Sequence, residues 1–98
     1  MAKTETLIGF AVKAKKAIFG ADRVEGNKTA ELIICCRSAS ERTIRNIALL
    51  KTGRLPVIIS EKPLEDIVYK KNCKVIGITD KQFAKAILES ITENFTMA

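Results

Sequence analysis

Residues 31–41 read Glu31-Leu32-Ile33-Ile34-Cys35-Cys36-Arg37-Ser38-Ala39-Ser40-Glu41, an apolar run followed directly by the signals that start a helix. The five apolar residues at 32–36 predict a strand that is covered on both faces. Ser38 and Glu41 have the spacing of a capping box, in which each side chain satisfies a backbone N–H group of the new helix. A strand that leads into a helix in this way predicts an α/β fold, whose ligands bind beyond the carboxyl ends of the strands.

Similar patterns along the rest of the chain predict alternating strands and helices. Apolar runs predict strands at residues 17–19, 32–36, 56–59 and 74–79. Apolar residues at helical spacing predict helices over residues 5–15, 21–25, 41–51 and 63–71, and after an N-cap at Asp80. Strands that are separated by helices are usually parallel neighbours joined by right-handed crossovers, so the expected architecture is a three-layer α-β-α sandwich.

Two places in this pattern are expected to lie outside the regular elements. Gly26 is expected to take a positive φ in the turn that leads into the strand at 32–36. Residues 94–98 are expected to form a frayed tail after the last helix.

The aromatic residues are mostly expected to lie in the core. Phe10, Phe19 and Phe83 fall within apolar stripes, which favours packing over contact with bases. Tyr69 and Phe95 are the two aromatic residues that the pattern leaves freer for the surface, although packing against the sheet is favoured for Tyr69 as well.

The composition describes one small basic domain. With 98 residues, 47% of them hydrophobic, and no Pro- or Gly-rich break, residues 1–98 are expected to form a single domain with a modest core. Seventeen Lys and Arg residues against eleven Asp and Glu residues give a net charge of +6. This charge favours a polyanionic partner or serves only solubility, and the composition leaves both interpretations open. No stretch is apolar and long enough to span a bilayer, so we expect a cytoplasmic protein without a membrane partner.

The three cysteines are expected to be core residues in a reducing compartment. Cys35 and Cys36 are adjacent in a strand, so their side chains point to opposite faces and make a poor disulfide framework. The chain has no histidine and no Cys-x-x-Cys motif, so no metal site is expected.

The residues that catalysis requires do not occur in a recognisable arrangement. Histidine, the commonest general base, is absent. Residues 20–26 lack the Gly-Lys-Ser/Thr ending of a phosphate-binding loop, and the glycines do not have the spacing of a dinucleotide-binding motif. Asp22, Glu25, Asp66 and Asp80 are interpreted as helix caps or solvated charges. The sequence therefore predicts a protein that is not an enzyme and carries no cofactor.

Several short phrases occur in an order that is shared with a known family. They are Gly9-Phe10-Ala11 with Lys16 and Gly20, residues 26–34 leading into Ser38-Ala39-Ser40-Glu41-Arg42-Thr43, Leu55-Pro56-Val57, and residues 78–85. Because these phrases occur in this order, the chain resembles the kink-turn RNA-binding ribosomal proteins, which are the L-seven-Ae and L-thirty-e family. It especially resembles the short bacterial ribosome-associated members of that family. The resemblance implies an α-β-α sandwich around a mixed, largely parallel four-stranded sheet. It also implies a non-catalytic protein that binds structured RNA, such as a kink-turn of ribosomal RNA with its sheared G·A pairs and flipped-out base.

The resemblance implies an RNA-binding edge that joins several loops. The residues that it implies are Lys13, Lys15, Lys16, Gly20, Ala21, Asp22, Arg23, Arg37, Leu64, Lys71 and Asn72. The cations among them are expected to converge on one edge of the fold. There Lys16 and Arg23 are expected to contact phosphate groups, with Arg37 and Lys71 flanking the groove.

Two departures from the family pattern keep a second interpretation open. Gly20-Ala21-Asp22-Arg23 stands where the family has Gly-x-Asn-Glu/Lys, so a carboxylate replaces the amide that reads a base edge. Pro63-Leu64-Glu65 stands where the family has Glu-Leu-Gly. The alternative is a protein-interaction or scaffold module on the same fold, which presents the apolar face of its last helix to a partner and does not bind kink-turn RNA.

Overall fold

The computed structural model describes residues 3–26, 29–49, 55–68, 73–91 and 95–97. Within them, helices and strands alternate in the order α1, β1, α2, β2, α3, β3, α4, β4, α5 and β5. The strands are β1 Ala17–Phe19, β2 Leu32–Cys36, β3 Val57–Ser60, β4 Val75–Ile78 and β5 Phe95–Met97. The helices are α1 Lys3–Lys13, α2 Ala21–Gly26, α3 Glu41–Ala48, α4 Leu64–Val68 and α5 Lys81–Glu89.

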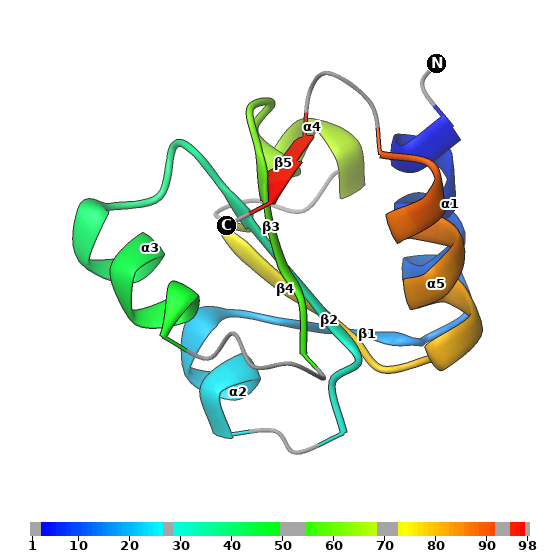
Figure 1. The fold of residues 1–98 in the computed structure, drawn as a ribbon, viewed down its shortest axis with the longest axis horizontal. Helices are drawn as coiled ribbons and strands as arrows, with labels where there is room; N and C mark the ends of the chain where they lie inside the picture. Colours follow the sequence, from blue (N-terminus) through cyan, green and yellow to red (C-terminus); the bar gives the residue numbers. More distant parts are fainter. Residues whose placement is uncertain (1–2, 27–28, 50–54, 69–72, 92–94, 98) are drawn as a thin grey trace.

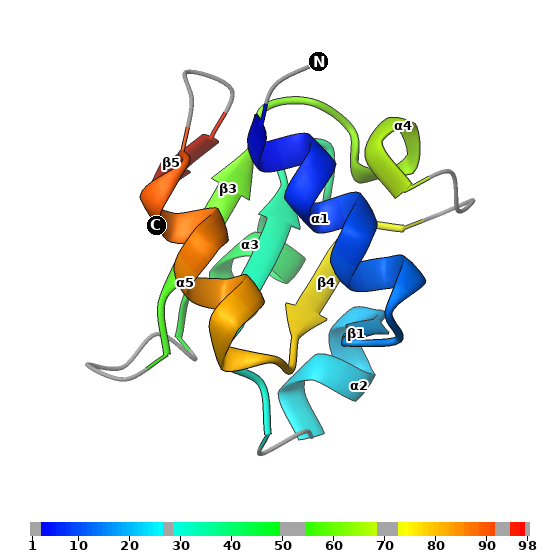
Figure 2. The same cartoon turned by 90° about the vertical axis from the view of Figure 1, so that its right-hand side faces the viewer.

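Helices cover both faces of a single sheet. Helices α1, α4 and α5 pack on one face, and α2 and α3 pack on the other (Figure 1). Figure 2 shows α1 and α5 side by side over the strands. The α/β class that the sequence predicts is therefore confirmed, and the helices lie on both faces as expected.

The sheet differs from the expected one in its number of strands and in their directions. The strand order is β1-β4-β2-β3-β5, in which β2 and β3 are parallel and the other three pairs are antiparallel. The prediction of a largely parallel four-stranded sheet is therefore wrong. The helix before β4 is short, with five residues in α4, and β4 runs antiparallel to β2. As a result, β4 begins at the edge where β3 ends.

Strand β5 replaces the expected frayed tail. Phe95 pairs with Ser60 and Met97 pairs with Ile58 in the antiparallel register of β3. The Phe95 side chain is only 3% exposed and belongs to the core, so the expectation of a freer Phe95 is also wrong. The burial of this aromatic ring removes a large apolar surface from water, which favours the pairing of β5 with β3.

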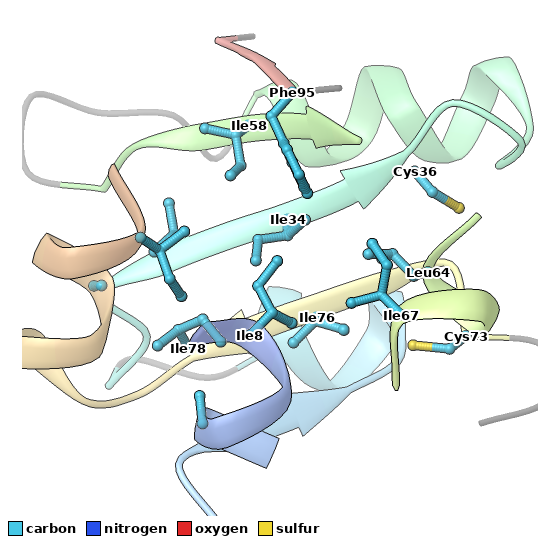
Figure 3. Close-up of a cluster of buried hydrophobic side chains, with 14 residues drawn as sticks. Ile8, Ile34, Cys36, Ile58, Leu64, Ile67, Cys73, Ile76, Ile78 and Phe95 are labelled. Atoms are coloured by element: carbon cyan, nitrogen blue, oxygen red, sulfur yellow. The ribbon is translucent and has the colours of Figure 1, made fainter. Parts of the chain in front are cut away.

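The side chains of β2 alternate between two cores. Leu32, Ile34 and Cys36 pack under α1, α4 and α5. Ile33 and Cys35 pack under α2 and α3. All five are fully buried, which explains why the strand needs an unbroken apolar run and confirms the predicted burial of both cysteines. Figure 3 shows the first core with labelled side chains from sheet and helices: Ile8, Ile34, Cys36, Ile58, Leu64, Ile67, Cys73, Ile76, Ile78 and Phe95.

Helix α3 is capped two residues later than the capping box predicts. Its N-cap is Ser40, which has an extended backbone and accepts a hydrogen bond from the Thr43 amide at 3.1 Å. Ser38 lies in the preceding turn, where its hydroxyl is 3.1 Å from Cys36 Sγ. The prediction chose the wrong residue because both serines precede the helix and only one has the extended backbone of an N-cap.

Candidate nucleic-acid interface

The short strand β1 separates the predicted site residues into two groups. At its start, the carbonyl of Lys16 accepts a hydrogen bond from the amide of Thr79, just past the end of β4. After its end, the amide of Gly20 donates to the carbonyl of Val75, at the beginning of β4. Lys16 and Gly20 therefore lie at opposite ends of the strands, about 13 Å apart over four extended residues.

Arg37 lies at the edge that contains Gly20. The amide of Cys36 donates to the carbonyl of Lys74, so β2 ends where β4 begins. We call this end of the sheet the Arg37 edge (Gly20, Arg37, Glu61 and Lys74) and the other end the Lys16 edge (Lys13, Lys15 and Lys16). The expected convergence of the cations on one edge is not found, because β1 runs from the Lys16 edge to the Arg37 edge.

The cations of the Arg37 edge already have carboxylate partners. Arg37 Nε lies 2.9 Å from a carboxylate oxygen of Glu61. Lys74 Nζ lies 3.2 Å from Glu65 Oε1 and also donates to the Ser38 hydroxyl at 3.3 Å. These pairs lower the local positive potential, so this edge attracts phosphate less than its Lys and Arg residues alone suggest.

The cations of the Lys16 edge have no such partner in the part of the chain that the structure describes. Lys13, Lys15 and Lys16 are exposed, and none forms an ion pair with another residue of the described part of the chain. Lys15 has a φ of 61°, so the chain turns sharply between α1 and β1. The carboxylate of Asp80 lies just beyond β4, where it accepts hydrogen bonds from the first amides of α5. That contact confirms Asp80 as the predicted N-cap.

Gly20, rather than Gly26, supplies the left-handed backbone conformation before the central strand. Its φ is +97°, whereas Gly26 is the last residue of α2 and has no such angle. The turn leads into α2, where Val24 is buried against the sheet and Arg23 is exposed. Arg23 has no ion-pair partner among the described residues, so its guanidinium group is available to an anion.

The remaining predicted site residues are placed as follows. Leu64 is the first residue of α4 and is fully buried in the core, so its side chain is not available to RNA in this fold. Ala21 begins α2 and Asp22 follows it, beside the Arg37 edge. Lys71 and Asn72 lie outside the described residues, as does Tyr69.

Phe10 is a surface residue that the sequence pattern assigned to the core. Its side chain is 52% exposed. Helix α1 instead turns Thr4, Ile8 and Ala11 inward, all of them fully buried. Both sets of residues have helical spacing, so α1 contains two competing stripes. The inward stripe includes Thr4, whose hydroxyl donates to the carbonyl of Ser90 at the end of α5.

A groove of about 660 Å³ lies between α1 and α5. The two helices are antiparallel, because Thr4 bonds to Ser90 at one end while Lys16 bonds to Thr79 at the other. The groove is lined by apolar, polar and charged side chains: Leu7, Gln82, Lys85, Ala86, Glu89, Ser90 and Ile91.

The cysteines form no reactive site in the described structure. All three are buried, and none of them forms a disulfide. Burial raises the pKa of the Cys35 thiol to about 11, the neighbouring Cys36 adds to the rise, and Arg37 opposes it. Cys35 is therefore a protonated thiol at neutral pH.

The fold and the two edges define a mixed α/β sandwich domain with an exposed basic surface. The domain is similar to a solved structure described as a protein with unknown function from Bacillus halodurans C. The two are 26% identical, the match covers 91% of this chain and 96% of that one, and the TM-score is 0.80. No protein-family model matches the chain, and no curated protein does. Within the described residues, no helix has the length and apolar character that crossing a membrane requires.

Proposed function

We propose that this protein is a non-catalytic RNA-binding protein that recognises a structured RNA of the kink-turn class. One observation carries the proposal. Lys13, Lys15, Lys16 and Arg23 are exposed and have no ion-pair partner among the residues that the structure describes. They follow one another along a single segment that leads from the Lys16 edge through β1 into α2. When unpaired Lys and Arg side chains contact phosphate groups, counterions that are condensed on the nucleic acid are released, which supplies a large share of the binding free energy.

The shape of this segment supports a folded RNA over a uniform duplex. The resemblance to the kink-turn binders covers the same segment, including the turn at Gly20. Lys13, Lys15 and Lys16 precede β1 and Arg23 lies in α2 after it, so an RNA that bends to follow the segment meets all four cations. Four phosphate contacts predict a slope of about −3 to −4 in a plot of log affinity against log salt concentration.

A charge-reversal experiment tests this proposal. The binding of a kink-turn RNA is compared with that of the same RNA whose G·A pairs are replaced by Watson–Crick pairs. We expect the wild type to prefer the kink-turn, and the Lys16→Glu/Arg23→Glu variant to bind it more weakly, with a salt slope that is flatter by about two units. A wild type that binds both RNAs equally would overturn the proposal.

The matched control reverses two cations that lie elsewhere. Arg42 and Arg45 are exposed on α3 and have no ion-pair partner in the described part of the chain, so Arg42→Glu/Arg45→Glu changes the net charge by the same amount. We expect this variant to keep the preference for the kink-turn. Equal losses in both variants would assign the binding to net charge alone.

A protein-interaction module on the same fold is the second candidate function. The apolar face of α5 does not carry it, because Ala84 and Ile87 are buried in the core. The observation that favours it is Leu49, which is 78% exposed at the end of α3. If the wild type shows no RNA preference, and if it forms a dimer that Leu49→Ser dissociates in analytical ultracentrifugation, this second function replaces the first.

We also propose a cytoplasmic location for the protein. The three buried cysteines support it, since none of them forms a disulfide and disulfides are rare in a reducing compartment. Fusion to a fluorescent protein and microscopy of the producing cell test the proposal, and a signal confined to the envelope would contradict it.

A further inference from the structure

Phe10 presents a large aromatic ring on the solvent side of α1. It and Leu49 are the exposed large hydrophobic residues of the described part of the chain. Ile8 and Ala11 fill the core on the inward side of the same helix, so packing within the fold does not require an aromatic residue at position 10. An exposed ring is available to stack on a flat partner.

Free positive charge lies on one side of this ring. Lys13 follows Phe10 by three residues on α1, so the two side chains share one face of the helix. Lys15 and Lys16 continue the Lys16 edge directly after the helix. All three lysines are exposed and without an ion-pair partner among the described residues.

The α1/α5 groove lies on the other side of the ring. Leu7 lines the groove and precedes Phe10 by one helical turn. Because α1 and α5 are antiparallel, Phe10 is level with the first turns of α5, where Gln82 and Lys85 line the groove. The carboxylate of Glu89 lies one turn farther along α5, away from the Lys16 edge.

We propose that Phe10 is a stacking platform for an unpaired RNA base, and that the adjoining single strand runs from the Lys16 edge into the α1/α5 groove. The Phe10 proposal rests on the proposed function, since it takes RNA as the partner. It gives the protein a second surface that contacts RNA. The ring stacks on the face of a base, while Lys13 and Lys85 meet the phosphates on either side. Gln82 offers both a donor and an acceptor to a base edge.

The charges around Phe10 favour a nucleic acid over a protein partner. Lys13, Lys15, Lys16 and Lys85 surround the path of the strand, and Glu89 is the acidic residue that lines the groove. Stacking on an aromatic ring tolerates any base, so the platform is expected to bind single strands with little sequence preference.

Binding of a twelve-nucleotide uridine RNA, measured by fluorescence anisotropy, tests the platform separately from the kink-turn. We expect Phe10→Ala to weaken this binding about 5-fold to 100-fold, and Phe10→Tyr to retain it. Leu49→Ala is the matched control, because it truncates the other exposed large hydrophobic residue and is expected to leave binding unchanged. Thermal unfolding of each variant checks that the fold is kept.

Distinct outcomes separate the platform from the kink-turn proposal. If Phe10→Ala binds the uridine RNA as tightly as the wild type does, or if the wild type does not bind it, the platform is overturned. The platform is also overturned if Phe10→Ala only dissociates a dimer of this chain and leaves RNA binding intact. If Phe10→Ala weakens the binding of single strands while the wild type shows no preference for a kink-turn, the platform stands and the kink-turn proposal fails.

Discussion

Arg37 Nε lies 2.9 Å from Glu61 Oε2, so the cation at the carboxyl end of β2 is held by the residue that follows β3. The side chains are 55% and 41% exposed, and an ion pair of this kind contributes little to folding. Its effect is on binding, because a phosphate group must compete with Glu61 before it contacts Arg37.

Removal of that competitor is predicted to strengthen RNA binding. Glu61→Gln frees Arg37, so we expect the affinity for the kink-turn RNA to rise about 2-fold to 5-fold, with a salt slope that is steeper by about one unit. The free energy of unfolding is expected to change by less than about 0.5 kcal/mol. Glu41→Gln on α3 is the control with the same change in charge, and an equal gain in both variants would contradict a specific role for Glu61.

The cap of α3 gives a prediction about stability. Ser40→Ala removes the hydroxyl that accepts from the Thr43 amide, so we expect the free energy of unfolding in urea to fall by about 0.5–2 kcal/mol. Ser38→Ala is the control, because Ser38 does not cap the helix, and its effect is expected to be smaller. A larger loss in the Ser38 variant would place the cap at Ser38.

The raised pKa of Cys35 predicts how stability changes at alkaline pH. The pKa of the thiol is about 11 in the folded protein and 9.0 ordinarily, so the unfolded chain releases this proton first as the pH rises. The contribution of the protonated Cys35 thiol to the free energy of unfolding is complete below pH 9 and is lost between pH 9 and about 11. We therefore expect the free energy of unfolding to fall more steeply over this range in the wild type than in Cys35→Ala. If plots of the free energy of unfolding against pH are parallel for the wild type and Cys35→Ala, this prediction is contradicted.

The buried ring of β5 predicts a large effect at the end of the chain. Phe95→Ala removes an aromatic side chain from the core, so we expect a loss of about 3–5 kcal/mol in the free energy of unfolding. Thr96 is exposed in the same strand, and Thr96→Ala is expected to have little effect. Similar midpoints of thermal unfolding for Phe95→Ala and the wild type would show that β5 does not hold the ring in solution.

The elements were predictable from local patterns, whereas their directions were not. Residues 32–36 are apolar without a break because both faces of β2 are covered, and that signal is visible in the sequence. Nothing in the apolar run of β4 encodes its direction, since parallel and antiparallel strands bury the same side chains. The strand β5 was missed because three residues with one buried ring do not form a recognisable period.

The candidate site was predictable only in part, for the same reason. The cationic residues were found by type, but their distribution over two edges depends on the direction of β1 relative to β4. The pairing of Arg37 with Glu61 joins residues 24 positions apart, beyond the reach of local patterns. Phe10 was assigned to the core because two stripes of α1 have helical spacing, and only the packing against α5 selects one of them.

Strand β5 is also expected to protect the protein against aggregation. With β5 in place, β3 has a neighbour on each side and its backbone groups are engaged. If β5 detached, Val57–Ser60 would become an open strand edge, rich in β-branched side chains, which is a template for pairing with a second molecule. A weakened β5 is therefore expected to cause aggregation before the rest of the sheet unfolds, so the resistance of the protein to aggregation depends on its last three described residues.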